Sequence, residues 1–400
     1  MKLKICNGQI ITPYRIIAGG TILIDGNKIT AVSGGNIDAE DAINIDAGEN
    51  YIAPGFIDIH IHGGGGYSFM DATAEAFLKI AETHARFGTT SLSPTTLSCS
   101  KEDLMAVLDC YEEANKINDK GAQFIGMHLE GPYLAVSQCG AQDTRYIRDP
   151  DPKEYMEILS RSNAICRWSI APELKGAMEL GRELRSRRIL AAIAHTDAIY
   201  EEALEAFESG YSLATHFYSA MSGVTRRKAF RYAGVIESCY LIDEMDVEII
   251  ADGVHLPAPL LKLICKVKGA GNIALITDAM RAAGTAASES VLGSLKNGLK
   301  VIVEDGVAKL PDRSGFAGSV ATTDRLVRTM VNMADVSLID AVRMMTVTPA
   351  RIMGISGQKG AIAAGKDADL VIFDKNINIE KTIVNGKVVY SKTTSEPPGC

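Results

Sequence analysis

Residues 56–66 read F-I-D-I-H-I-H-G-G-G-G, and this stretch is the best guide to both the fold and the site. Isoleucine at every second position alternates with polar residues, which is the period of a β-strand. Side chains two residues apart on a strand point to the same face, so His60 and His62 project together. Such a pair can chelate a divalent metal, although two packed strand histidines would look the same. The glycines that follow end the strand and allow another group to come close.

The composition is that of a globular protein. The chain has 400 residues, 46% of them hydrophobic and 22% charged, and this length predicts one large domain and one smaller one. A net charge of −8 argues against a general nucleic-acid binder. The cysteines are scattered without a C-x-x-C pair, and the first residues lack a signal-peptide pattern. No apolar run approaches the ~18 residues of a membrane span, so we expect a soluble, cytoplasmic protein.

Both ends of the chain are rich in short predicted strands. In residues 1–53 these strands are separated by hairpin-type turn signals at Asn7-Gly8, Asp25-Gly26 and Gly34-Gly35. Residues 350–392 return to strands, with a further turn signal at Asn385-Gly386. We expect 1–53 and 350–392 to pair as one small β-sandwich domain, followed by a frayed tail at 393–400.

Residues 54–349 alternate short apolar strands with amphipathic helical stretches. The expected strands are 57–62, 89–95, 124–130, 165–171, 189–195, 212–216, 248–252 and 273–278. Repeated βα units on continuous apolar strands predict an α/β fold, the (β/α)8 TIM barrel, whose sites lie at the carboxyl ends of the strands. A later helix is predicted over 338–345, with Ser337 as its N-cap.

Metal-ligating side chains gather at those strand ends. They are His60, His62, Glu130, His195, His216, Asp252, His255 and Asp278. The chain has only seven histidines, and scattered core histidines would not be distributed in this way. The set can hold one or two divalent ions with Glu130 bridging, and Zn²⁺, Fe²⁺, Co²⁺ or Mn²⁺ would all suit. Such a centre activates water, with Asp278 as general base and acid, as a metal ligand, or as both. His128 and His84 are expected to be structural.

Several motifs resemble the amidohydrolase superfamily and, within it, the N-acetylglucosamine-6-phosphate deacetylases. They are H-I-H-G-G-G-G-Y-S-F-M-D (60–71), H-L-E-G-P-Y (128–133), A-H-T-D-A (194–198), A-D-G-V-H (251–255) and T-D-A-M-R-A-A-G (277–284). The resemblance implies that acetate is released from an N-acetyl amino-sugar phosphate. It places Glu130, His195 and His216 on the main metal, Asp278 as catalytic acid/base, and His255 beside the acetyl carbonyl. Some relatives bridge two metals through a lysine at the end of strand 4. The corresponding strand here ends W-S-I-A-P-E (168–173) and has no lysine, which leaves Glu130 for the bridging role.

The resemblance also implies a set of residues that bind the sugar phosphate. They are Gln142, Ser219, Ala220, Arg227, His255, Phe316, Ala317 and Gly318. The family motif H-x-x-N-A-M reads H-F-Y-S-A-M (216–221) here, and the E-P-G that usually follows the arginine is missing. Arg227 lies in a basic segment, 226–231, which suits a phosphate or, alternatively, solvent. In the family this arginine reaches a neighbouring subunit, which implies a homodimer.

Two further interpretations stay open at the level of the sequence. Another hydrolase on the same scaffold, for N-acetylgalactosamine 6-phosphate or for an N-acyl amino acid, would keep the same strand ends, because specificity lies in the loops. A non-catalytic module on this scaffold would have no need of metal ligands, yet every expected ligand is present. The basic segment favours a phosphorylated substrate over an N-acyl amino acid.

Overall fold

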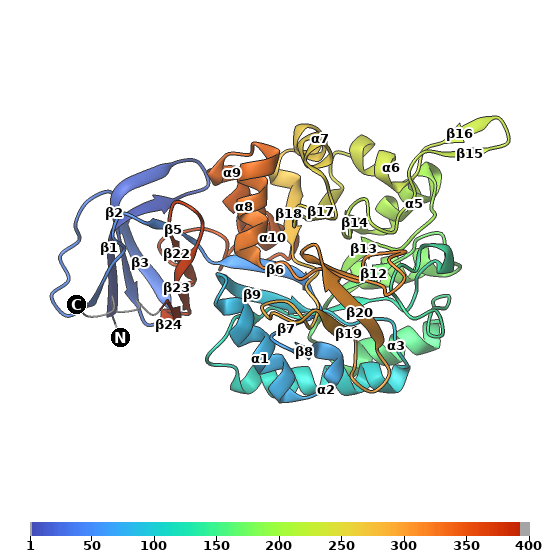
Figure 1. Ribbon diagram of the computed structural model, residues 1–400, viewed down its shortest axis with the longest axis horizontal. Coiled ribbons are helices and arrows are strands. Elements are labelled where there is room, and N and C mark those ends of the chain that lie inside the picture. Colours follow the sequence, from blue (N-terminus) through green and yellow to red (C-terminus); the bar gives the residue numbers. More distant parts are fainter. Residues whose placement is uncertain (1, 393–400) are drawn as a thin grey trace.

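The computed structural model describes residues 2–392, which form a sheet-rich unit beside a curled parallel sheet surrounded by helices (Figure 1). The tail expected to fray, 393–400, lies outside the described residues. In the described part of the chain no helix combines the length and the apolar character needed to cross a membrane.

The sheet-rich unit, at the left of Figure 1, brings the two ends of the chain into one eight-stranded sheet. Its strands are β1 (Lys2–Ile11), β2 (Ile16–Asp25), β3 (Lys28–Ser33), β4 (Ile43–Asp46), β5 (Tyr51–Pro54), β22 (Leu370–Phe373), β23 (Ile379–Val384) and β24 (Lys387–Ser391). The order is β24-β23-β22-β5-β1-β2-β3, with β4 beside β1. Because β22 pairs antiparallel with β5, strands from the two ends of the chain lie side by side in this sheet.

Two of the predicted hairpin turns are wrong. Asn7-Gly8 lies inside β1, at a shift in register against β2, and Asn7 takes a φ of 57° there. A bulge needs the same left-handed backbone as a hairpin turn, so the dipeptide alone cannot distinguish them. Gly34-Gly35 leads from β3 to β4, which pairs with β1, so it is a loop. The other two turn signals do join antiparallel neighbours, β2–β3 and β23–β24.

The curled parallel sheet contains every strand expected between 54 and 349. Its members are β6 (Phe56–Ile61), β9 (Thr89–Pro94), β10 (Gln123–Phe124), β11 (Met127–Glu130), β12 (Ile165–Ile170), β13 (Leu190–Ile193), β14 (Tyr211–Ala214), β17 (Asp246–Ile250) and β18 (Ile273–Ile276). They form the runs β10-β9-β6 and β11-β12-β13-β14-β17-β18. A parallel bridge between Thr95 and His128 joins the runs on one side, and Asp278 N donates to His60 O (2.9 Å) on the other. The result is a barrel-like core.

Helices cover the outside of this core (Figure 1). They are α1 (Ala74–Ala85), α2 (Lys101–Ile117), α3 (Pro152–Arg161), α4 (Ala177–Ser186), α5 (Tyr200–Ser209), α6 (Val235–Leu241), α7 (Ala258–Lys268), α8 (Thr323–Ala334), α9 (Leu338–Met345) and α10 (Val347–Ile352). Helix α9 has the predicted bounds, and the Ser337 side chain accepts from Asp340 N as the expected N-cap. On β6, Ile57 and Ile59 pack in an outer apolar cluster, which leaves the intervening side chains for the interior.

Two insertions were not predicted from the sequence. The basic segment forms a hairpin of β15 (Thr225–Arg227) and β16 (Phe230–Tyr232), which projects from the upper right of Figure 1. A three-stranded sheet of β19 (Glu289–Leu292), β20 (Leu299–Glu304) and β21 (Val307–Lys309) follows β18. Both insertions lie beyond the carboxyl ends of core strands, where loops can lengthen without disturbing the core.

Candidate metal centre

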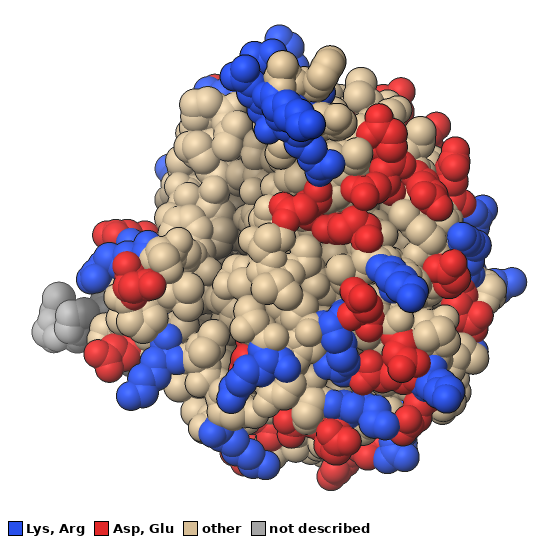
Figure 2. Space-filling view, turned by 90° about the vertical axis from the view of Figure 1, so that its right-hand side faces the viewer, with Lys and Arg blue, Asp and Glu red and all other residues tan. Residues whose placement is uncertain are grey.

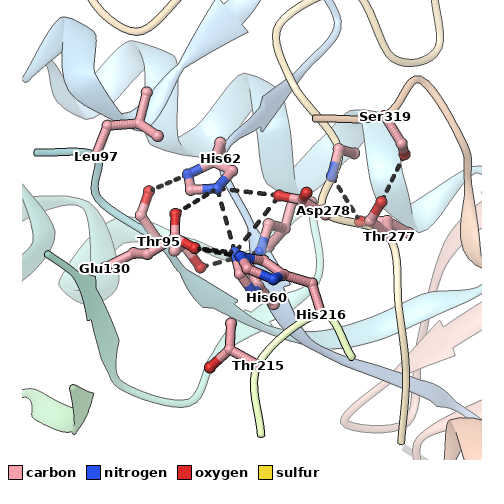
Figure 3. Close-up of polar contacts among 12 residues, drawn as sticks. His60, His62, Thr95, Leu97, Glu130, Thr215, His216, Thr277, Asp278 and Ser319 are labelled. Atoms are coloured by element: carbon pink, nitrogen blue, oxygen red, sulfur yellow. Dashed lines mark hydrogen bonds and ion pairs between the residues drawn. The ribbon is translucent and has the colours of Figure 1, made fainter. Parts of the chain in front are cut away.

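Four imidazoles and two carboxylates converge at the carboxyl ends of five strands. Figure 3 shows the part of this cluster formed by His60, His62, Glu130, His216 and Asp278. All six side chains are buried, between 0% and 8% exposed: His60, His62, Glu130, His195, His216 and Asp278. They form two ligand triads that share a carboxylate. The first triad is His60, His62 and Glu130, and the second triad is Glu130, His195 and His216. The predicted convergence of strand ends is therefore present in the structure.

The ring nitrogens are spaced as ligands of a common ion. His60 Nε2 lies 3.2 Å from His62 Nε2, and His195 Nε2 lies 3.2 Å from His216 Nε2. Glu130 Oε1 is 3.0 Å from His216 Nε2, while its Oε2 is 3.4 Å from His62 Nε2. Tetrahedral ligands at about 2.0–2.1 Å from zinc stand at comparable distances from one another. The residues present therefore fit one divalent cation or two.

Three of these residues leave their strands with a left-handed backbone. His195 has a φ of 46°, His216 a φ of 32° and Asp278 a φ of 47°. Such values are uncommon outside glycine and mark sites where the surrounding structure fixes the backbone. Ser319 N donates to Asp278 O (2.8 Å), which holds one of the three turns in place. The sharp turns direct the side chains into the mouth of the core.

In three of the four imidazoles the second ring nitrogen faces a backbone carbonyl. His62 Nδ1 faces Thr95 O (3.3 Å), His195 Nδ1 faces Gln138 O (2.7 Å) and His216 Nδ1 faces Ser219 O (3.1 Å). A carbonyl can only accept a hydrogen bond, so each Nδ1 must carry the proton. The Nε2 lone pairs are then free to bind a metal, which is the usual arrangement around metal-ligating histidines.

The charges within the cluster also fit a cation. Burial alone would raise the pKa of Glu130, but His60, His195 and His216 hold it well below its usual range. Burial would lower the pKa of His62, yet the carboxylates of Asp278 and Glu130 outweigh it and raise that pKa to about 10. The carboxylate oxygens thus stabilise positive charge at the point where the ligand atoms meet. A divalent cation would supply that charge in place of protons on the imidazoles.

The glycine run after β6 is explained by close contacts. A Cβ on Gly64 would lie 2.4 Å from His84 Nε2, and one on Gly65 would lie 2.2 Å from Thr83 Oγ1. His84 is fully buried and its Nε2 faces Gly63 O at 3.0 Å. The predicted structural role of this histidine agrees with its place under the glycine loop.

His128, the other weak candidate, lies within the core, where its ring packs edge-on against that of His60 with centroids 4.7 Å apart. Its Nε2 is 2.7 Å from Ser169 Oγ, and its Nδ1 is 3.2 Å from Thr95 Oγ1. Both nitrogens are therefore engaged, and neither is directed at an ion. Burial holds the pKa of His128 well below its usual value, so the ring is neutral.

A cavity of about 490 Å³ opens above the ligand triads. Its lining includes six of the eight residues expected to bind substrate: Gln142, Ser219, Ala220, His255, Phe316 and Gly318. Asp278, Glu130, His62, His195 and His216 line it as well. Among the described residues, Ala317 and Arg227 do not.

His255 is oriented by a neighbouring carboxylate. Its Nδ1 lies 2.8 Å from Asp252 Oδ2, and Asp252 Oδ1 accepts from Val254 N and His255 N, both at 2.8 Å. The Phe316 ring packs against the imidazole, with centroids 4.6 Å apart. Because His255 lines the cavity while its Nδ1 is engaged, Nε2 is the nitrogen left for a ligand.

Three predicted substrate residues are placed differently from the others. Gln142 lines the cavity, but its Nε2 donates to Glu130 Oε2 (2.7 Å) and its Oε1 accepts from Ser98 N (2.8 Å). Ala317 is fully buried, and its N–H donates to Ala308 O (3.0 Å). Arg227 lies on the projecting hairpin, exposed, with its guanidinium 5.1 Å from the centre of the Tyr232 ring.

Other lining residues were missed by the sequence analysis. They include Leu97, Gln138, Tyr218, Ile250 and Leu292. The Tyr218 hydroxyl is 3.1 Å from that of Tyr240, which fixes the ring at the wall. These residues lie on loops or have ordinary apolar side chains, so a search for titratable groups at strand ends does not find them.

Comparison with known proteins agrees with this geometry. The model of the amidohydrolase family matches residues 51–389. The chain is 32% identical to N-acetylglucosamine-6-phosphate deacetylase of Bacillus subtilis (strain 168), over 97% of each chain. It is 30% identical to N-acetylgalactosamine-6-phosphate deacetylase of Escherichia coli O157:H7, over 84% of this chain and 87% of that protein.

A solved structure extends the likeness to the fold. The crystal structure of N-acetylglucosamine-6-phosphate deacetylase from Pasteurella multocida superposes with a TM-score of 0.91 at 28% identity, covering 98% of this chain and 100% of that one. The match includes both the sheet-rich unit and the barrel-like core. On its family match, its near full-length relatives and its fold, the chain belongs to the amidohydrolase family.

Proposed function

We propose that this protein is a metal-dependent hydrolase that removes acetate from N-acetylglucosamine 6-phosphate to give glucosamine 6-phosphate. The observation that carries this proposal is the pair of ligand triads on the floor of a single cavity. Full-length similarity to N-acetylglucosamine-6-phosphate deacetylases supports the choice of substrate. We read the curled sheet as a (β/α)8 barrel over 54–349, and residues 1–53 with 350–392 as a β-sandwich domain.

The ligand triads would hold one or two divalent ions per subunit. Glu130, His195 and His216 would bind one ion, and His60, His62 and Glu130 a second. A bound divalent cation supplies Lewis-acid chemistry, which polarises a carbonyl and makes hydroxide available near neutral pH. Nitrogen and oxygen donors suit Zn²⁺, Fe²⁺, Co²⁺ or Mn²⁺, so the donor set leaves the choice of metal open.

Two residues of the chain would handle the reacting amide. Asp278 Oδ1 lies 3.1 Å from His62 Nε2 and 3.4 Å from His60 Nε2, so its carboxylate borders the position where water would be held. It would take a proton from the attacking water and return it to the departing amine nitrogen. His255, oriented through Asp252, would donate from Nε2 to the acetyl oxygen as negative charge develops there.

The phosphate group of the substrate would be bound by the hairpin of a second copy of the chain. The described lining of the cavity contains neither lysine nor arginine, whereas the hairpin carries Arg226, Arg227, Lys228 and Arg231. In Figure 2, which views the end of the molecule that carries the hairpin, Lys and Arg gather at the top. A homodimer in which this hairpin reaches the neighbouring cavity would supply the missing cation, with Arg227 as the phosphate ligand.

A cytoplasmic setting is part of the proposal. All cysteines in the described residues are free thiols, and two of them, Cys99 and Cys239, are buried. Disulfides form in oxidising compartments and are rare in the cytosol, so free thiols favour a reducing compartment.

The test is acetate release from N-acetylglucosamine 6-phosphate, N-acetylgalactosamine 6-phosphate and unphosphorylated N-acetylglucosamine, using metal-reconstituted protein. Preference for the first substrate is expected. Preference for the second would favour the N-acetylgalactosamine-6-phosphate deacetylase activity named for some relatives. Ser219, which differs from the family motif, would then be the first residue to test as the cause of that preference. Equal rates with phosphorylated and unphosphorylated N-acetylglucosamine would contradict the phosphate-binding role of the hairpin. Inactivity on all three substrates would refute the proposal.

A further inference from the structure

A fully buried ion pair lies inside the barrel-like core. Arg167 comes from β12 and Glu248 from β17, and both side chains are 0% exposed. Arg167 Nη2 donates to Glu248 Oε2 (2.8 Å), and Nη1 donates to the other carboxylate oxygen. Neither residue lines the cavity in the described part of the chain. Removing two charges from water is costly, and well-packed apolar residues could fill the same volume, so the pair is weak evidence for stability alone.

The ion pair touches one of the metal-ligating histidines. Glu248 Oε2 lies 3.4 Å from His60 Nδ1. The other three imidazoles of the ligand triads direct Nδ1 at neutral backbone carbonyls. Among these four histidines, His60 therefore stands alone in having a carboxylate as its outer partner. A carboxylate there fixes the Nδ1–H tautomer and makes Nε2 a better donor to a metal.

Arg167 holds this carboxylate in place. Besides Glu248, its Nη2 donates to Thr215 Oγ1 (2.8 Å) and its Nη1 to Ile59 O (3.2 Å). The guanidinium therefore ties β17 and the end of β14 to β6, the strand that carries His60. Its positive charge also offsets the desolvation of Glu248, whose pKa burial would otherwise raise.

We propose that Glu248, held by Arg167, is a positioning residue for His60 and controls how tightly the first triad retains its ion. This inference rests on the proposed metal centre and deepens it. Among the described residues, the imidazoles of His195 and His216 make no hydrogen bond with the ion pair, because their outer partners are Gln138 O and Ser219 O. Disrupting the pair should therefore weaken one ion selectively, whereas a merely structural role would weaken both or neither.

The experiment compares the wild-type chain with Glu248→Gln and with the double variant Arg167→Met/Glu248→Leu. The first variant removes the charge at His60 but leaves Arg167 unpaired; the second removes both charges at similar volume and keeps the test valid if the first does not fold. Metal per chain is measured by elemental analysis, the two affinities by chelator competition, and the coordination by the visible spectrum of Co²⁺-loaded protein.

The expected result is a fall of about 10- to 100-fold in the affinity of one ion, with the affinity and the Co²⁺ spectrum of the other unchanged. Asp369→Asn is the matched control. Asp369 is also a buried carboxylate paired with a buried cation, Lys359, but it lies in the sheet-rich unit next to β22. This control should lower thermal stability and leave both metal affinities as they are.

Two results with the double variant overturn the inference. Either the double variant binds both ions with wild-type affinity, or it folds and loses both ions to the same degree. A wild-type chain that binds a single ion would also overturn it, while leaving the proposed function standing. Among these metal measurements, a wild-type chain that binds no divalent ion is the result that would count against the proposed function itself.

Discussion

Replacing Gln142 by leucine tests whether this residue serves the substrate or the metal centre. In the structure its amide is used at both ends, by Glu130 Oε2 at 2.7 Å and by Ser98 N at 2.8 Å. Leucine has a similar volume but offers neither a donor nor an acceptor. The variant therefore loses the hydrogen bond that holds the shared carboxylate and leaves a buried backbone N–H without its acceptor.

The magnitude follows from these two contacts. A hydrogen bond to a charged group contributes about 1.5–3 kcal/mol. At about 1.4 kcal/mol for each factor of ten, its loss corresponds to a 10- to 100-fold decrease in metal affinity. The unpaired Ser98 N–H should cost a further 1–3 kcal/mol or so of folding stability. Metal affinity and thermal stability should therefore fall together, while KM at saturating metal changes little.

The assay combines chelator competition, thermal unfolding and steady-state acetate release at saturating metal. Gln358→Leu is the control, because Gln358 is an exposed glutamine beside Gln123 at the amino-terminal end of the core strands. Unchanged metal affinity with a large rise in KM would refute the argument. That result would return Gln142 to the substrate-binding role predicted from the sequence.

Four further predictions follow from the site and its surroundings. Asp278→Asn should retain metal and lower kcat by about 10²- to 10⁴-fold, the usual contribution of a general acid/base; near-normal turnover would exclude that role. Gly64→Ala should lower the unfolding temperature, because the new Cβ would lie 2.4 Å from His84 Nε2, whereas Gly35→Ala, with nothing within 4 Å, should be tolerated. Arg227→Ala should raise KM for the phosphorylated sugar by an amount equivalent to about 1.5–3 kcal/mol and leave the unphosphorylated sugar unaffected; equal effects on both sugars would contradict the phosphate assignment. Chelation should lower the unfolding temperature reversibly, since an ion present at about 100 times its Kd contributes about 2.7 kcal/mol to the folded state; an unchanged transition would argue against a resident metal.

The sequence was most informative where a local pattern has only one structural solution. Alternating isoleucines in 56–61 and the apolar runs that follow define strands by their period, and parallel strands bring their carboxyl ends together. For that reason the sequence alone identified six candidate metal ligands at the strand ends: His60, His62, Glu130, His195, His216 and Asp278. Turn dipeptides were less informative, because Asn7-Gly8 satisfies a bulge as well as a hairpin.

The tertiary structure decided everything that depends on contacts between distant parts of the chain. The sequence places Gln142 in a loop, but only the folded loop shows its amide on Glu130. Arg167 and Glu248 lie 81 residues apart on ordinary strands, and their pairing beneath His60 depends on the register of the curled sheet. Strand period and strand-end chemistry are local properties that sequence determines by itself, whereas partners across the core depend on how the strands are packed in three dimensions.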